Sequence, residues 1–110
     1  MPYVDIIAST EITSQQEMSL KASFGGIISV IPGKSEKSLM LRMQDKQRMW
    51  FAGDSSEPSA FVNVMLYKNA DREYCKAFSE KAIEIIEEEL GIKKGFIYVK
   101  FDETLNFFWG

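Results

Sequence analysis

The feature that most constrains the fold is an internal repeat with a spacing of 58 residues. The apolar, β-branched run 3–7 (YVDII) matches the run 61–65 (FVNVM), and each run is typical of a buried strand. Each strand is followed by a helical stripe whose members correspond at the same spacing: Leu20, Phe24, Ile27 and Ile28 in the first copy, and Phe78, Ala82, Ile85 and Ile86 in the second. The run 39–45 then matches 96–102 at a spacing of 57. Each half therefore predicts a β-α-β unit.

Two such units, related by a pseudo-two-fold axis, predict a single α+β domain spanning residues 1–110, with a four-stranded mixed sheet and both helices on one face. The first helix begins at Thr13 or Ser14, with Glu17 placed to complete a capping box from Ser14. The remaining bounds follow from turn residues and composition: strands at 3–9, 38–44, 59–67 and 96–101, a short additional strand at 49–53, and a second helix at about 70–90.

Strand alternation predicts that the two faces of the sheet differ in chemistry. The face towards the helices carries Val4, Ile6, Val62, Val64, Ile97 and Val99, and the opposite face carries Tyr3, Asp5, Ile7, Arg42, Phe61, Asn63, Met65, Tyr67, Tyr98 and Lys100. The second set is too aromatic for open water and too polar for a dry core. We therefore expect other subunits to cover it.

Charge and composition argue against several classes of function. The net charge is −3 without any basic run, so we expect no nucleic-acid partner. No apolar stretch is long enough to span a bilayer and no secretory signal is recognisable, which predicts no membrane association and a cytoplasmic location, with signal-independent secretion as the alternative. The chain has no histidine and one cysteine, Cys75, so we expect no metal site, no internal disulfide and no cofactor.

The lack of histidine also restricts the groups that can transfer protons near neutral pH. Proline is small enough for Met1 to be removed before it, which would leave Pro2 with a free secondary amine. An α-amino group has a reference pKa of roughly 7.7–8.0, and burial or a nearby cation would lower it. Pro2 is therefore a candidate general base. The alternative is a proline that merely begins a strand.

Three other features favour structural interpretations or stay open. Residues 33–35 (GKS) lack the preceding glycine of a phosphate-binding loop, because Ile28 occupies that position. Asp54 and Glu57 are more consistent with loop solvation and capping than with a catalytic carboxylate pair. Tyr98 is equally compatible with a core or interface position and with substrate contact.

Five short motifs then complete a pattern: Met1-Pro2 at the first strand, Pro32-Gly33-Lys34 after the first helix, residues 51–58 (FAGDSSEP), Tyr98 in the last strand and residues 106–109 (NFFW). Together with the doubled β-α-β layout, they resemble macrophage migration inhibitory factor and its relatives in the tautomerase superfamily over essentially the whole chain. The resemblance implies a homotrimer with active sites between subunits. It also implies a keto–enol tautomerase that acts on phenylpyruvate-like α-keto acids or dopachrome-like compounds.

The resemblance assigns roles to particular residues. Pro2 matches the family's catalytic base, and Lys34 matches the cation that holds the substrate carboxylate and lowers the pKa of Pro2. Tyr67 matches the position whose backbone amide lies beside the substrate. Phe107 and Trp109 match the apolar wall around the substrate ring.

Other positions match a neighbouring-subunit contact or depart from the family. Tyr98 matches a tyrosine that the adjacent subunit contributes. A Cys-x-x-Cys pair of the cytokine-type members is replaced by Ser59 and Val62, so we expect no thiol–disulfide oxidoreductase activity. Lys100 replaces an asparagine of the pocket and adds a charge that can change substrate preference. The alternative function is a cytokine-like protein that binds a receptor and retains only vestigial catalysis.

Overall fold

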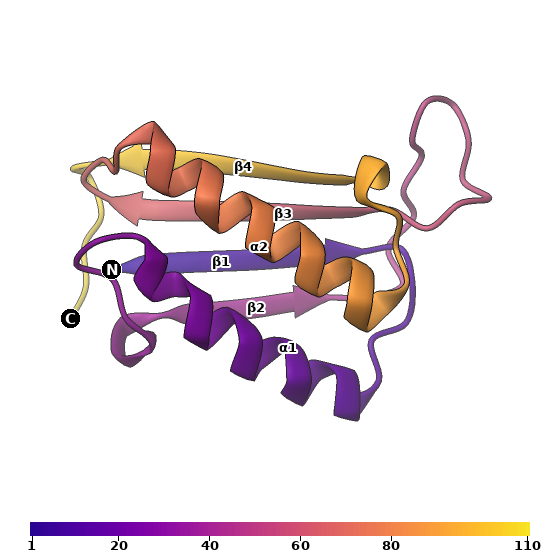
Figure 1. The fold of residues 1–110 in the computed structure, drawn as a ribbon, viewed down its shortest axis with the longest axis horizontal. Coiled ribbons are helices and arrows are strands. Elements are labelled where there is room, and N and C mark those ends of the chain that lie inside the picture. Colours follow the sequence, from indigo (N-terminus) through magenta and orange to yellow (C-terminus); the bar gives the residue numbers. More distant parts are fainter.

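The structure is a computed structural model that describes residues 1–110. It contains the strands β1 (Pro2–Ala8), β2 (Met40–Gln44), β3 (Ala60–Tyr67) and β4 (Ile97–Thr104), and the helices α1 (Ser14–Ile27) and α2 (Arg72–Leu90). The sheet order is β2-β1-β3-β4, with parallel outer pairs and an antiparallel central pair. Both helices lie on one face of the sheet (Figure 1). The predicted fold class is confirmed.

The strand register confirms the repeat and corrects one of its spacings. In the central pair, Asp5 faces Asn63, its own counterpart at 58 residues. In the outer pairs, Asp5 faces Arg42 and Asn63 faces Lys100. Arg42 and Lys100 are therefore also 58 residues apart. The predicted spacing of 57 for the second strand of each unit was therefore wrong by one residue. A slip of one residue would turn every side chain of that strand to the other face.

Helix α1 begins with a capping box that differs from the predicted one. The Thr13 hydroxyl accepts a hydrogen bond from the Gln16 N–H at 3.2 Å, and the Gln16 side chain accepts one from the Thr13 N–H at 2.9 Å. Thr13 is therefore the N-cap, and the predicted pair of Ser14 and Glu17 was wrong. Both pairs have the required spacing, so the sequence pattern alone did not discriminate between them.

Helix α2 ends at Leu90, as predicted, and the following Gly91 adopts the left-handed conformation (φ 69°) and donates its N–H to the Glu87 carbonyl at 3.0 Å. Neither helix combines the length and the apolar composition that crossing a membrane requires.

The core lies between the helices and the sheet. All the side chains predicted to face the helices contribute to it: Val4, Ile6, Val62 and Val64 are fully buried, Ile97 is nearly so, and Val99 packs at the edge. Phe24 of α1 meets Phe78 of α2 edge to face, with ring centroids 6.2 Å apart. No helix covers the opposite face of the sheet (Figure 1).

The two glycines near the end of α1 have different surroundings. Gly25 is buried, and a side chain there would overlap the Glu36 carboxylate. Gly26 is exposed, and a Cβ atom there would meet nothing within 4 Å. Of the two positions, only Gly25 therefore lies against a neighbouring side chain.

Replacing Gly26 should stabilise the protein. Gly26→Ala removes backbone freedom from the unfolded chain without a clash, so we expect the free energy of unfolding to rise by about 0.5–1 kcal/mol. Urea denaturation followed by circular dichroism measures this change. A decrease in the free energy of unfolding would show that an alanine at position 26 is not accommodated in the helix without strain.

The connection between β2 and β3, residues 45–59, extends beyond the end of the sheet (Figure 1). The strand predicted at 49–53 does not form. Phe51 and Asp54 instead make an isolated bridge, with backbone hydrogen bonds of 2.8 and 3.0 Å. Ala52 and Gly53 between them have φ values of 53° and 80°, which close a tight turn.

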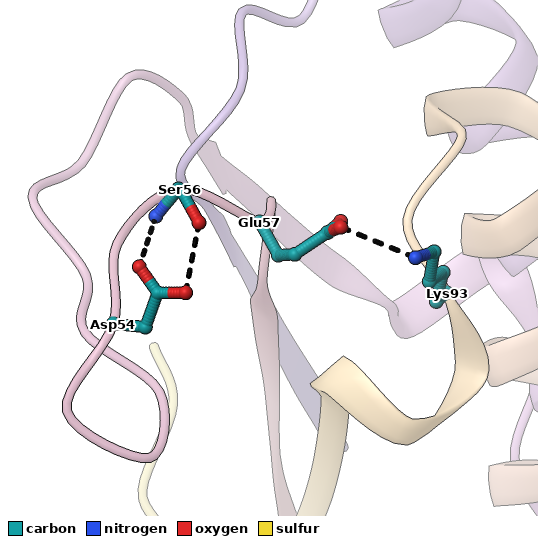
Figure 2. A network of polar contacts seen from close by, with 4 residues as sticks. All are labelled: Asp54, Ser56, Glu57 and Lys93. Carbon is teal, nitrogen blue, oxygen red and sulfur yellow. Dashed lines mark hydrogen bonds and ion pairs between the residues drawn. The ribbon is translucent and has the colours of Figure 1, made fainter.

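Two polar contacts fix this loop (Figure 2). The Asp54 carboxylate accepts hydrogen bonds from the N–H and the hydroxyl of Ser56, both at 2.8 Å, and these bonds lower the pKa of Asp54. Glu57 forms an ion pair with Lys93 at 3.1 Å. The two carboxylates have separate partners, in agreement with their interpretation as loop-stabilising groups.

Candidate active site

Four segments that are distant in sequence meet at one end of the sheet. Pro2, at the start of β1, pairs with Leu66 near the end of β3, and Leu66 pairs with Glu103 near the end of β4. The tail 105–110 continues from β4, and the connection 31–39 enters β2 at the same end. Both termini are close together there (Figure 1). The topology therefore gathers loops around the start of the chain.

The backbone of Tyr67 links the N-terminus to Lys34. Its N–H donates to the Met1 carbonyl at 3.2 Å, and its carbonyl accepts a hydrogen bond from the Lys34 ammonium at 3.0 Å. The Pro2 nitrogen is bonded to that Met1 carbonyl carbon. The backbone of Tyr67 thus contacts both the Lys34 side chain and the residue that precedes Pro2.

The surroundings of the N-terminus change the pKa of the Met1 amine. Burial lowers the pKa of the Met1 ammonium below its ordinary value, and the charge and hydrogen bonding of the Lys34 side chain lower it further. Two positive groups in a partly desolvated corner repel each other. Both effects shift the equilibrium of this amine towards its neutral form.

A cavity of about 650 Å³ opens beside these groups, within the range of small-molecule sites. Its wall includes Met1, Lys34, Tyr67, Lys68, Asn69, Asp71, Tyr74 and Trp109. A second, more apolar cavity of about 500 Å³ shares Met1 and Trp109 with the first and adds Pro2, Phe107 and Phe108. Pro2 therefore lies where a polar and an apolar cavity adjoin.

The C-terminal tail supplies aromatic rings to this region. The Trp109 ring meets the Tyr67 ring edge to face at a centroid distance of 5.3 Å, and the Phe107 ring is 6.4 Å from that of Trp109. Trp109 remains 55% exposed and so is accessible to a ligand. Phe107 and Trp109 thus lie beside the predicted site.

Tyr98 is not brought to the other predicted residues within one chain. It pairs with Phe61, which faces Ile7, five residues along β1 from Pro2. At about 3.3 Å per residue, this separation is roughly 16 Å along the strand. Tyr98 is 58% exposed and packs against the Phe51 ring, with centroids 5.4 Å apart.

Four polar residues of the cavity wall were not identified from the sequence: Lys68, Asn69, Asp71 and Tyr74. Tyr74 has the helical spacing of a core residue with respect to Phe78, but it is half-buried and lines the cavity. The other three lie in the loop between β3 and α2. The only indication in the sequence that they belong to a site is their position, since loops at strand ends often carry functional residues. No group of three His, Cys, Asp or Glu side chains is arranged to hold a metal ion.

Comparison with solved structures places the chain among known folds. Leishmania major MIF2 matches with a TM-score of 0.91 and 29% identity, covering 99% of this chain and 93% of that one. The macrophage migration inhibitory factor homologue of Prochlorococcus marinus matches with a TM-score of 0.85 and 28% identity, covering 98% and 93%. Pt0534, solved after inactivation by 2-oxo-3-pentynoate, matches with a TM-score of 0.82 and 17% identity, covering 93% and 85%.

No protein-family model and no curated protein sequence matches the chain. The structural likeness nevertheless extends over nearly the full length of this chain and of the first two matches. It agrees with the order of motifs and with the doubled β-α-β layout. The chain therefore has the fold of the macrophage migration inhibitory factor homologues and is similar to them over almost its whole length.

Proposed function

We propose that the protein is a keto–enol tautomerase for phenylpyruvate-like α-keto acids or dopachrome-like compounds, with the amine of Pro2 as general base after removal of Met1. The observation that carries the proposal is the convergence of the N-terminus, Lys34 and the Tyr67 backbone on one cavity. The fold supports a tautomerase-type or migration-inhibitory-factor-like function in general terms.

The base must be unprotonated near neutral pH. Burial and Lys34 already lower the pKa of the Met1 amine. Pro2 begins β1 one residue further in and is buried, so its free amine would be desolvated and would feel the same lysine. Both effects would lower the pKa of a Pro2 amine, which is the direction that enolisation near neutral pH requires.

Removal of Met1 would also create a hydrogen-bond donor. In the full chain the Tyr67 N–H donates to the Met1 carbonyl, and without Met1 this donor loses its acceptor. It is then available to an oxygen of a substrate that occupies the vacated space. The Lys34 ammonium has no carboxylate within 4.0 Å and is available to the substrate carboxylate.

In the proposed reaction, the Pro2 nitrogen takes a proton from the carbon next to the ketone. The C–H electron pair forms the C=C bond of the enolate, and the carbonyl π pair moves to oxygen. The protonated Pro2 then returns its proton to that oxygen, which gives the enol. Phe107 and Trp109 would shield the substrate ring from water.

One further observation supports α-keto acids as the substrate class. Pt0534 was inactivated by 2-oxo-3-pentynoate, which is itself an acetylenic α-keto acid. The direct test is enolisation of phenylpyruvate by protein whose loss of Met1 has been checked by intact mass. No turnover by the Met1-free chain would contradict the proposal.

The proposed assembly is a homotrimer in which the neighbouring subunit supplies Tyr98. This is supported by the exposure of Tyr98 at the far end of the sheet and by the open sheet face. On that face the side-chain oxygen of Asn63 is inaccessible and has no hydrogen-bond partner within the chain. Contact with another chain would supply one.

Sedimentation should therefore give about 37.8 kDa, three times the chain mass of 12.6 kDa. Ile7→Asp, in the same face, should shift the protein towards the monomer because it buries an unpaired charge at the interface. Glu11→Asp, an exposed position outside the sheet, is the matched control. A monomeric wild-type chain would contradict the assembly.

A second candidate function is receptor binding, favoured by the likeness to proteins named as macrophage migration inhibitory factors. Such a protein would bind a receptor ectodomain equally well with Pro2 altered. A tautomerase would lose turnover in the same variant, so one substitution distinguishes the two functions.

A further inference from the structure

A second lysine lines the cavity that contains Lys34. Lys68 follows β3 directly and contributes to the same wall of the 650 Å³ cavity. Its ammonium nitrogen is 5.4 Å from the centroid of the Tyr67 ring, which in turn packs against Trp109. Lys34 thus lies at the Tyr67 carbonyl, and Lys68 lies at the aromatic part of the cavity.

The backbone does not require a lysine at this position. Lys68 adopts the left-handed conformation, with φ at 66°, and its N–H donates to the Thr104 carbonyl at 3.0 Å. Glycine or asparagine fits such a turn with less strain than a residue with a long side chain. The turn alone therefore does not explain Lys68.

The charges of the wall are not balanced within the chain. The four ion pairs of the protein involve other lysines, so neither Lys34 nor Lys68 has a carboxylate within 4.0 Å. The one carboxylate on the wall belongs to Asp71, which is the N-cap residue of α2. Two unpaired ammonium groups on one cavity suit a ligand with two negative charges.

We propose that Lys68 binds a second carboxylate of the substrate, so that the site prefers aromatic α-keto acids with two carboxylates over phenylpyruvate. This inference rests on the proposed function, in which Lys34 holds the carboxylate next to the ketone. The ring of such a substrate would lie against Tyr67 and Trp109. Lys68 is then a specificity-determining residue.

The kinetic test compares phenylpyruvate with its para-carboxy derivative, which differs by one carboxylate. The wild-type protein should have the higher kcat/KM for the dicarboxylate. Lys68→Gln should lower that value about fivefold and change kcat/KM for phenylpyruvate less than twofold, whereas Lys68→Arg should retain the preference. Equal loss for both substrates, or no loss, would overturn the inference.

Lys46→Gln is the matched control. Lys46 is also an exposed lysine in the left-handed conformation, with φ at 53°, but it follows β2 at the opposite end of the sheet. We expect no change in substrate preference. Lys68→Gly should also lose the preference while it relieves the backbone strain, so a thermal melt no lower than wild type excludes unfolding as the cause.

A binding test separates this inference from the tautomerase proposal. The chain has two tryptophans, so Trp50→Phe leaves Trp109 as the only one, and its fluorescence reports ligands in the cavity. Benzene-1,4-dicarboxylate should bind about fivefold more tightly than benzoate, and Lys68→Gln should abolish the difference. If this holds without enolisation of either substrate, the charge recognition stands and the proposed reaction fails. If enolisation occurs but the difference does not depend on Lys68, this inference fails alone.

Discussion

Pro2→Gly is expected to lower kcat/KM for phenylpyruvate enolisation by at least about a hundredfold, because a positioned general base contributes roughly 10²–10⁴ to a rate. Glycine leaves a primary amine on a backbone that is no longer fixed by the pyrrolidine ring. The base is then both more mobile and less well aligned. Absorbance of the enol measures the rate.

The control for this prediction is Pro58→Gly, which changes a proline in the loop before β3, far from the cavity. Its activity should equal that of the wild type. Protein that retains Met1 should be inactive, since its Pro2 nitrogen is an amide. Full activity in Pro2→Gly, or in protein shown by intact mass to carry Met1, would exclude Pro2 as the base.

Lys34→Gln is expected to lower kcat/KM about 10- to 100-fold at neutral pH, because a hydrogen bond to a charged group contributes about 1.5–3 kcal/mol. A second effect adds to the first. The positive charge of Lys34 lowers the pKa of the Met1 amine and should lower that of a free Pro2 amine in the same way, so its removal should raise the pKa of the base. The base then stays protonated to higher pH, and the rising limb of the pH–rate profile should move to higher pH.

Two variants separate these effects. Lys34→Arg keeps the charge, so its profile should stay close to that of the wild type even if its rate falls. Lys37→Gln removes an exposed lysine from the same connection, in the short turn Glu36–Ser38, and should change neither rate nor profile. A Lys34→Gln profile with an unshifted rising limb would show that Lys34 does not act on the base.

Most of the fold could be predicted because the repeat carries both periodicity and pairing. The matched strands 3–7 and 61–65 are alternating and apolar, and their pairing through Asp5 and Asn63 follows from the two-fold relation between the units. The strand predicted at 49–53 failed because apolar and aromatic residues suggest a strand, but Ala52 and Gly53 close a turn instead. At this position the preference of the backbone for a tight turn outweighs the strand preference of the neighbouring aromatic residues.

The site was predictable only in part. Lys34, Phe107 and Trp109 were placed through the resemblance, since nothing in their local pattern distinguishes them from surface or core residues. Tyr74 has helical spacing with Phe78, which is typical of a core position, but it lies in the first turn of α2, beside the cavity. The placement of the Lys68 side chain depends on the left-handed conformation of its backbone. Nothing in the local sequence predicts this conformation.

Covalent labelling tests the central claim most directly, namely that an unblocked Pro2 nitrogen with a lowered pKa faces the cavity. The amine should add to the triple bond of 2-oxo-3-pentynoate, forming an N–C bond while its proton moves to the adjacent carbon. Peptide mapping should find one adduct per chain on Pro2, formed in parallel with the loss of activity, at a rate that rises with pH and levels off below the ordinary pKa of an α-amino group. Inactivation with the label on another residue, or a free Pro2 that stays unmodified, would contradict the mechanism.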